Sequence, residues 1–296
     1  MIVVFGSINL DLIFALPHLP APGETVLGPT TRIEPGGKGA NQAVAAARDG
    51  ARVIMAGAVG RDALATDALR LLRQANVDLT RVAETETTTG CAAIAVDPQG
   101  RNAIAVGSGA NLLANASKIE DALLTQQTTL VLQMEVPADR TAALIHRAKA
   151  HRARIILNLA PAAALPIEAL KALDILTLNE TEADWLAAHL SCAATAQALQ
   201  TTLGITVIRT LGENGLESAT SQGVQHIPAR RIIPIDTTAA GDCFVGVLAA
   251  ALDRGQSLTD ALQRATTAAA LCCMKAGSQG SLPWAAEIDA YPDATG

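Results

Sequence analysis

Continuous apolar runs of strand length alternate with alanine-rich stretches along most of the chain. The runs are IVVFG (2–6), RVIMAGAVG (52–60), TLVLQME (129–135), RIILNLA (154–160), DILTLNE (174–180) and ITVIRTLG (205–212). Runs without polar alternation are typical of strands buried on both faces, and helical stretches between them indicate crossovers that join parallel strands. The pattern therefore predicts an α/β fold with a mainly parallel sheet covered by helices on both faces.

Two segments interrupt this alternation of strands and helices. Residues 12–34 and 89–107 are typical of short strands, and the second pair is joined by the turn Asp97-Pro-Gln-Gly100. We expect strands drawn from about residues 10–34 and 89–107 to form a small β-sheet lid that excludes water from the site. Because no repeat, low-complexity tract or linker divides the chain, residues 1–296 are predicted to form a single domain.

Several predicted strands end at, or shortly before, a polar residue. These residues are Asn9, Glu135, Asn158, Asn179 and Thr210. In open parallel sheets, ligands bind beyond the carboxyl ends of the strands. Loop solvation explains any one of these residues more simply, but five in step favour a binding site.

The composition supports a folded chain and argues against two classes of partner. Half of the 296 residues are apolar but only 2% are aromatic, so the core must be built from Ala, Val, Leu and Ile. The formal net charge is -6 and there is no Lys/Arg run, which predicts neither a nucleic-acid nor a membrane partner. The N-terminus lacks the pattern of a signal peptide, so we expect a cytoplasmic protein.

The five cysteines are scattered, without C-x-x-C spacing. They are Cys91, Cys192, Cys243, Cys272 and Cys273. Their odd number and spacing indicate reduced thiols. The adjacent pair lies in an apolar helical run, which favours small buried hydrophobes over ligands.

The stretch Asp236-Thr-Thr-Ala-Ala-Gly-Asp242 carries the clearest chemical signal. Its small residues lead into the apolar helix CFVGVLAAALDRG, so Asp242 lies in the first helical turn. Bare N–H groups at a helix N-terminus form an anion cradle suited to a phosphoryl group, and Gly241 permits close approach. Asp242 beside that cradle could accept the proton of an attacking hydroxyl. An acid that complements the helix dipole is the alternative, but the paired Asp236 and the apolar helix favour catalysis.

The stretch Glu34-Pro-Gly-Gly-Lys-Gly-Ala-Asn-Gln42 is a glycine-rich turn that opens a helix. It is not a Walker A loop, because Gly39 follows Lys38 where Ser or Thr should hold magnesium, and it lacks the dinucleotide G-x-G-x-x-G spacing. The glycines would instead let a compact polyol approach the backbone, with Lys38 and Asn41 as donors to its hydroxyls. A plain tight turn explains the glycine pair equally well.

Asn9 and Asp11 flank Leu10 and therefore lie on one face of an extended segment. A carboxylate beside an amide suits a vicinal diol, because the pair accepts hydroxyl protons and donates to a lone pair. Helix capping by Asp11 is the alternative, although the Ile-Phe-Ala-Leu run that follows is a poor helix.

Two other strand ends leave their function open. Asn179 and Glu182 have the spacing of an N-cap and its capping box, so structure alone could account for both residues. The turn from Thr210 to Gly215 could carry nucleotide phosphates on its backbone or simply reverse the chain.

In their order, these motifs resemble the PfkB family of carbohydrate kinases, and in particular its ribokinase-type members. The resemblance runs almost end to end and rests on GSINLDL, PGGKGANQAVAAA, LQMEVP, LNETEA, RTLGENG, DTTAAGDCF and AGSQGSLPWAAEID. It implies a ribokinase-like three-layer α/β/α sandwich with a small β-sheet lid through which such kinases form homodimers. It also implies transfer of the ATP γ-phosphoryl group to the 5-hydroxyl of ribose.

Matching motif positions imply a role for each site residue. Asp242 would be the base, and the anion hole would be formed by Ala239, Ala240 and Gly241. The sugar would meet Asn9, Asp11, Gly37, Lys38, Asn41 and Glu135. ATP would meet Asn179, Thr210, Leu211, Gly212 and Gly215, while Glu182 would act near Mg²⁺ through water.

Similar kinases are activated by a monovalent cation, usually K⁺, beside the anion hole. The matching positions are Asp236, Thr238, Cys272, Lys275, Gly277 and Ser281. Several would act through backbone carbonyls, so Cys272 and Lys275 need no particular side chain. The resemblance therefore implies Mg²⁺ and K⁺ as cofactors, with ATP as co-substrate.

Other functions stay open at this point. Within the same reaction class, the acceptor could be 2-deoxyribose, another furanose sugar or a nucleoside. A sugar- or nucleotide-binding regulator without catalysis is a different class, which the intact set of Asn9, Asp11, Lys38 and Asp242 disfavours. A dehydrogenase would need a glycine fingerprint at the first βα turn, and GSINLDL does not supply it.

Overall fold

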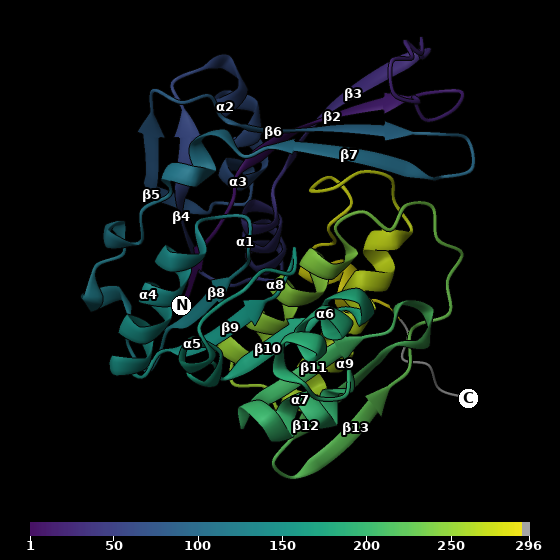
Figure 1. The fold of residues 1–296 in the computed structure, drawn as a ribbon. Helices are drawn as coiled ribbons and strands as arrows, with labels where there is room; N and C mark the ends of the chain where they lie inside the picture. Colours follow the sequence, from purple (N-terminus) through teal and green to yellow (C-terminus); the bar gives the residue numbers. More distant parts are fainter. Residues whose placement is uncertain (292–296) are drawn as a thin grey trace.

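A computed structural model describes residues 1–291, within which a nine-stranded sheet and a separate four-stranded sheet are formed (Figure 1). The large sheet has the order β13-β12-β11-β10-β9-β8-β1-β4-β5. Its strands are β1 Ile2–Phe5, β4 Val53–Gly60, β5 Asp78–Thr85, β8 Thr129–Leu132, β9 Arg154–Asn158, β10 Ile175–Leu178, β11 Thr206–Thr210, β12 Leu216–Thr220 and β13 Gly223–Ile227. Neighbours from β11 to β5 are parallel, which confirms the predicted fold class.

The sequence analysis missed β5, β12 and β13, which lie at the two sides of the sheet. β5, with the sequence DLTRVAET, is only partly buried, so it shows no continuous apolar run. β12 and β13 form an antiparallel hairpin whose outer strand is largely exposed. Edge strands need less apolar surface than central ones, which is why the pattern of apolar runs found only the central strands.

Alternate residues of β1 enter two separate hydrophobic cores. Ile2 and Val4 pack with α1, α8 and α9, whereas Val3 and Phe5 pack with α4, α5, α6 and α7 on the other face. The helices are α1 Lys38–Arg48, α2 Ala63–Ala68, α3 Arg70–Gln74, α4 Ala138–Ala150, α5 Ile167–Lys171, α6 Glu180–Leu190, α7 Ala196–Leu203, α8 Ala240–Asp253, α9 Leu258–Cys273 and α10 Ala285–Asp289. Within residues 1–291, every helix is too short or too polar to cross a bilayer.

The order of the strands reverses beside β1. β4 and β5 extend the sheet on one side of β1, whereas β8 and its successors extend it on the other. Ligand sites of open α/β sheets lie at such a switch point, beyond the carboxyl strand ends. The polar residues that follow β1 and β8 are Ser7, Asn9, Gln133 and Glu135.

Helices α1 and α8 cross so closely that a glycine is required between them. A Cβ atom at Gly246 would lie 2.5 Å from the carbonyl oxygen of Gln42 and 2.6 Å from the Cβ of Ala45. α8 is buried from Asp242 to Leu252 and lies in the core on this face of the sheet. The crossing brings the first turns of the two helices together.

The four-stranded sheet, which we call the lid sheet, has the order β3-β2-β6-β7. Its strands are β2 Asn9–Ala15, β3 Thr30–Gly36, β6 Gly90–Val96 and β7 Asn102–Gly107. β2 and β3 fall mainly in the first predicted lid segment, although β2 begins at Asn9, and β6 and β7 fall in the second. Figure 1 shows the lid sheet extending away from the large sheet.

The outer face of the lid sheet is largely apolar, whereas the inner face also carries charged residues. The strand register places Asp11, Ile13, Ile94 and Ile104 on its inner face. This face and the segments 234–238 and 276–277 line a cavity of about 840 Å³. The outer face carries Leu12, Phe14, Ile33, Cys91, Ala93, Ala95, Ala103 and Ala105.

Candidate active site

The first turn of α8 faces a cavity of about 250 Å³. Its N-cap is Ala239 in the left-handed conformation, with φ of 59°, and the N–H of Ala240 donates weakly to the carbonyl of Thr237 at 3.3 Å. A Cβ atom on Gly241 would meet no other atom within 4 Å. Because the first N–H groups of a helix have no intrahelical partner, this turn can present them to an anion. Ala239, Ala240 and Gly241 line the cavity, and their role as an anion hole stays a prediction.

Both carboxylate oxygens of Asp242 accept hydrogen bonds from α1. Asn41 Nδ2 donates to Oδ2 and Gln42 Nε2 donates to Oδ1, each at 2.9 Å. Asp242 is only 6% exposed, so its negative charge depends on these donors. Asn41 Oδ1 is buried without a partner among the described residues, which leaves an acceptor for a ligand hydroxyl. Sequence reasoning had singled out Asn41 but not Gln42.

Glu135 and the glycine-rich turn meet at the switch point. Ser7 Oγ donates to Glu135 Oε2 at 2.5 Å, and the backbone N–H of Lys38 donates to the same oxygen at 3.0 Å. Gly37 has a φ of 88°, and a Cβ atom there would lie 2.8 Å from the backbone nitrogen of Asn9. A Cβ atom on Gly36 would overlap the carboxylate of Asp11. The glycines therefore allow the turn to pack against the strand that carries Asn9 and Asp11.

Asn9 is held by Asn111, a residue that sequence reasoning did not find. Asn111 Nδ2 donates to Asn9 Oδ1 at 2.7 Å, while Asn111 Oδ1 accepts the N–H of Ile8 at 2.9 Å. Because the amide oxygen of Asn9 is occupied, its NH₂ group is left to donate to a ligand. Asn111 lies 102 residues away in sequence, so no local pattern could have linked it to Asn9.

The charges at the site are crowded around Lys38. Burial raises the pKa of Asp11 to about 7, and the carboxylates of Glu135, Glu34 and Asp242 add to this shift while Lys38 opposes it. The pKa of Lys38 is raised, mainly by Asp242, despite its own burial. Lys38 therefore carries a positive charge among the carboxylates of Asp11, Glu135 and Asp242, and it lines the cavity at α8.

Asn179 and Glu182 form the capping box of α6 that was one reading of their spacing. Glu182 N–H donates to Asn179 Oδ1 at 2.9 Å, and Asn179 N–H donates to Glu182 Oε2 at 2.8 Å. Both side chains also line the cavity at α8. Burial raises the pKa of Glu182, and the charge of Lys38 opposes that shift. A ligand role for either residue is compatible with the cap and stays a prediction.

A second cavity of about 590 Å³ adjoins the first through shared residues that include Thr210, Gly241 and Phe244. Gly212 and Gly215 line it in positive-φ conformations, at 54° and 86°. Leu211 lines neither cavity, because its N–H closes the turn onto the carbonyl of Gly215 at 2.8 Å. The other predicted ATP residues thus surround two joined cavities, whereas Leu211 acts on the turn itself.

The predicted cation positions lie on two segments that meet beside α8. Asp236 Oδ1 accepts the N–H of Thr238 at 2.9 Å, and Oδ2 accepts the N–H of Gly277 at 3.0 Å. Both contacts lower the pKa of Asp236 against the effect of burial. The carboxylate is therefore ionised and fixes the two segments to each other.

Cys272 and Ser281 complete this contact. The Cys272 thiol lies 3.7 Å from the carbonyl of Thr238 and 3.0 Å from Ser281 Oγ. The ammonium of Lys275 is instead paired with Glu287 at 2.5 Å, so only its backbone could serve a cation. The fold brings these predicted positions together, while a role in cation binding stays a prediction.

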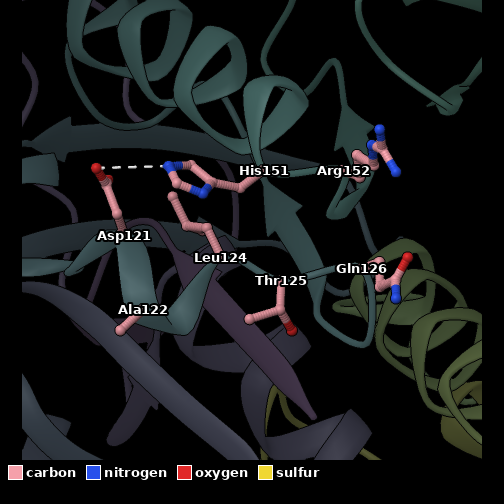
Figure 2. A pocket seen from close by; sticks show the side chains of 7 residues that line it. All are labelled: Asp121, Ala122, Leu124, Thr125, Gln126, His151 and Arg152. Atoms are coloured by element: carbon pink, nitrogen blue, oxygen red, sulfur yellow. Dashed lines mark ion pairs between the residues drawn. The ribbon is translucent and has the colours of Figure 1, made fainter.

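A separate hollow lies away from this site. Figure 2 shows Asp121, Leu124, Thr125 and His151 around it, with His151 Nε2 3.5 Å from Asp121 Oδ2. Its residues Thr125 and Gln126 precede β8, so the hollow lies near the amino end of that strand. The polar strand ends described above face the opposite edge of the sheet.

The chain matches known proteins along most of its length. Residues 1–285 match the model of the pfkB family carbohydrate kinases. The chain belongs to this family. Ribokinase from Staphylococcus aureus (strain COL) is 36% identical over 301 residues, which cover 97% of this chain and 98% of the relative. Deoxyribokinase from Salmonella typhi is 33% identical over 301 residues, which cover 98% of each chain.

A crystal structure of ribokinase from Thermotoga maritima, 31% identical in sequence, matches this pfkB-family chain with a TM-score of 0.89 over 98% of both chains. The family and the ribokinase-like fold expected from the motifs are thereby confirmed. The match also fits the α/β layers and the small separate sheet of this kinase.

We predict that Asp11→Asn stabilises the unliganded kinase at pH 8 and weakens sugar binding. The pKa of Asp11 rises from 3.8 to about 7 on folding, so the folded state binds more protons between these values. The contribution of Asp11 to stability is therefore present at low pH and is lost as the pH rises through 7. Asparagine does not titrate, so the variant's gain in unfolding temperature over wild type should grow from pH 5 to pH 8.

Thermal unfolding across this pH range measures the effect. The exposed Asp184 on α6 offers a control for the substitution itself, because Asp184→Asn removes a carboxylate that lies in solvent. A gain for Asp11→Asn that does not change with pH would contradict the assignment.

Proposed function

We propose that this kinase transfers the γ-phosphoryl group of ATP to the 5-hydroxyl of ribose, giving ribose 5-phosphate and ADP. The observation that carries the proposal is the position of the Asp242 carboxylate. It lies in the first turn of α8, at the cavity lined by the bare helix N-terminus, and is bonded to Asn41 from the glycine-rich turn. This position would put a base between a polyol-binding cluster and an anion cradle. The similarity to ribokinases supports ribose as the acceptor.

The sugar-side residues would orient the acceptor. Asp11 would accept protons from neighbouring hydroxyls, and the NH₂ group of Asn9, freed by Asn111, would donate to a hydroxyl oxygen. Asn41 Oδ1 would gain the partner that it lacks. Gly37 would let the sugar approach the backbone, while Glu135 would bind it from the switch point. Holding the 5-hydroxyl in this way lowers the entropic cost of reaction.

In the transfer step, Asp242 would accept the 5-hydroxyl proton as the sugar oxygen bonds to the γ-phosphorus and the bond from phosphorus to the ADP oxygen breaks. Charge on the transferred group would be stabilised by Lys38 and by the N–H groups of residues 239–241. The adenosine part would occupy the cavity of about 590 Å³ beside Gly212 and Gly215. This arrangement would allow an in-line transfer, with the acceptor and ADP on opposite sides of the phosphorus.

Glu182 gives the cavity at α8 a carboxylate oxygen that could bind a divalent ion. Within residues 1–291, no three His, Cys, Asp or Glu side chains are arranged to hold a metal. Mg²⁺ suits such a site, because it binds through phosphates, waters and one or two carboxylates. Glu182, at the cavity, would hold the hydrated ion, which neutralises phosphate charge when it is bound.

For the monovalent cation, Asp236 and the carbonyls near Thr238, Cys272 and Gly277 provide an oxygen-rich donor set. The Asp236 carboxylate is charged and already bridges the two segments. A bound K⁺ would hold the start of α8 in place electrostatically, at a distance from the substrate. We propose K⁺ as an activator on this basis.

We further propose that the kinase forms a homodimer through the outer face of the lid sheet. That face exposes Ile33, Ala93, Ala103 and Ala105, with Leu12 and Phe14 half-buried beside them. A sheet this thin cannot bury both apolar faces within one chain, since only its inner face turns toward the site. A second copy of the same face would cover it with matching small residues.

Replacing Asp242 by Asn should lower kcat about 10²–10⁴-fold, because the base is lost, while the Kd for ribose changes little. A coupled ADP-release assay and calorimetry measure the two quantities. Asp260→Asn is a matched control, because Asp260 occupies the first turn of α9 and is exposed. Wild-type turnover in the Asp242 variant would rule out this mechanism and revive the non-catalytic regulator.

The same assay tests the acceptor. Ribose should give the highest kcat/KM among ribose, 2-deoxyribose, fructose, adenosine and pseudouridine. Preference for 2-deoxyribose would instead align the kinase with the deoxyribokinase relative. Preference for a nucleoside would mean that the site also binds a nucleobase, for which the inner face of the lid sheet is the candidate surface.

Potassium should raise kcat/KM several-fold over sodium at equal ionic strength, and Asp236→Ala should abolish the difference. The physical reason is that the carboxylate of Asp236 both attracts the cation and joins its two segments. Steady-state rates in potassium, sodium and tetramethylammonium chloride measure this. Equal rates in all three salts would remove the cation site from the proposal.

Ala105→Glu should convert the dimer to a monomer, because it places a charge in the proposed apolar interface. Val106→Glu is its control, since the next residue of β7 points to the opposite face and is also exposed. Sedimentation equilibrium distinguishes one chain of 30.4 kDa from two. A wild-type monomer at micromolar concentration, or a dimer unaffected by Ala105→Glu, would contradict the lid interface.

A further inference from the structure

We infer that Gln42 is a positioning residue for the base, the last member of a one-way chain of amides that starts at Gln133. The inference rests on the proposed function, because it takes Asp242 as the base. Gln42 and Gln133 are both fully buried and come from different elements, α1 and the end of β8. Neither residue is needed to explain the predicted contacts with sugar or ATP.

Both amide protons and the amide oxygen of Gln42 have hydrogen-bond partners. Gln42 Nε2 donates to Asp242 Oδ1 at 2.9 Å and to Asn158 Oδ1 at 3.1 Å. Its Oε1 accepts from Gln133 Nε2 at 2.7 Å. The side-chain amide of Gln42 thus uses both protons and its oxygen in one buried network, which leaves it a single orientation.

The direction of these bonds is dictated by charge. A carboxylate can only accept, so Gln42 must turn its NH₂ group toward Asp242. Its oxygen then faces Gln133, which must offer an NH₂ group in turn. Reversing Gln42 would place its oxygen against the carboxylate, and reversing Gln133 would place two amide oxygens against each other.

The amide of Gln133, where the series of hydrogen bonds begins, packs against Gly6, which has no side chain. A Cβ atom on Gly6 would overlap Gln133 Oε1. That oxygen has no hydrogen-bond partner among the described residues, so packing rather than bonding fixes it. Gly6 directly follows β1, so the end of that strand sets the amide that orients Gln42.

Two consequences follow for catalysis. With Asn41 on the other oxygen, Gln42 fixes the plane of the Asp242 carboxylate. Each oxygen already accepts one hydrogen bond, so the directions of the remaining lone pairs are fixed as well. These lone pairs would accept the 5-hydroxyl proton.

The test uses Gln42→Met, which keeps the length of the side chain and removes all its hydrogen bonds. We expect kcat to fall about 10- to 100-fold, as for one lost bond to a charged group, with the Kd for ribose within twofold of wild type. The acidic limb of the kcat/KM profile should move to higher pH, because the carboxylate loses a hydrogen-bond donor. A merely structural role would change the unfolding temperature without moving that limb.

A second pair of variants tests the direction of the chain without touching Asp242. Gln133→Glu can only accept from Gln42, so it should turn the amide of Gln42 and present an oxygen to the base. Gln133→Met removes one bond but imposes no such reversal. We therefore expect Gln133→Glu to lower kcat at least fivefold more than Gln133→Met and to shift the acidic limb in the same sense as Gln42→Met.

The control is Ser218→Ala, which alters a buried hydroxyl on β12 that has no partner among the described residues. Its rate and pH profile should match wild type. Wild-type kcat and pH profile in folded Gln42→Met, or equal losses in the two Gln133 variants, would overturn the inference. Full activity in Asp242→Asn would instead overturn the proposed function, so the two failures are distinguishable.

Discussion

A charge buried beneath a helix has to be matched by donors, and in this protein the donors belong to another helix. The carboxylate of Asp242 on α8 is bonded to Asn41 and Gln42 on α1. These side chains reach the carboxylate because the helices cross at Gly246, which has no Cβ atom to separate them. The same crossing closes one of the two hydrophobic cores. Core packing and site geometry therefore depend on a single contact between helices.

The remaining charges at the site are arranged around this contact. Burial, together with the charges of Glu135, Glu34 and Asp242, raises the pKa of Asp11 to about 7, while Lys38 lies among these carboxylates and opposes the shift. An unliganded protein that holds such a cluster gives up stability, a common property of sites prepared for a ligand. Hydroxyl groups of a bound sugar would supply the donors that Asp11 lacks. A bound sugar would relieve these unfavourable electrostatics, and this relief would contribute part of the free energy of sugar binding.

The sequence was informative wherever a local pattern reports the structure. The central strands are buried on both faces and appear as apolar runs, and the cap at Asn179 is visible in a four-residue spacing. β5, β12 and β13, at the two sides of the sheet, lack that signal. Gln133 and Asn111 were missed for a different reason: their bonds join residues 91 and 102 positions apart, which no local pattern encodes. Leu211 lies in the predicted turn, where its N–H donates to the carbonyl of Gly215, and it is not among the residues that line the two cavities.

The glycine at the helix crossing has a practical consequence for engineering. A glycine inside a helix costs about 1 kcal/mol of helix propensity relative to alanine, so propensity alone would make Gly246 an early choice for a stabilising substitution. Here the methyl group would push against the Gln42 carbonyl and separate the two helices that hold Asp242. A screen that measures thermal stability alone would miss the second role of Gly246. The glycine also keeps the carboxylate of Asp242 within reach of its donors.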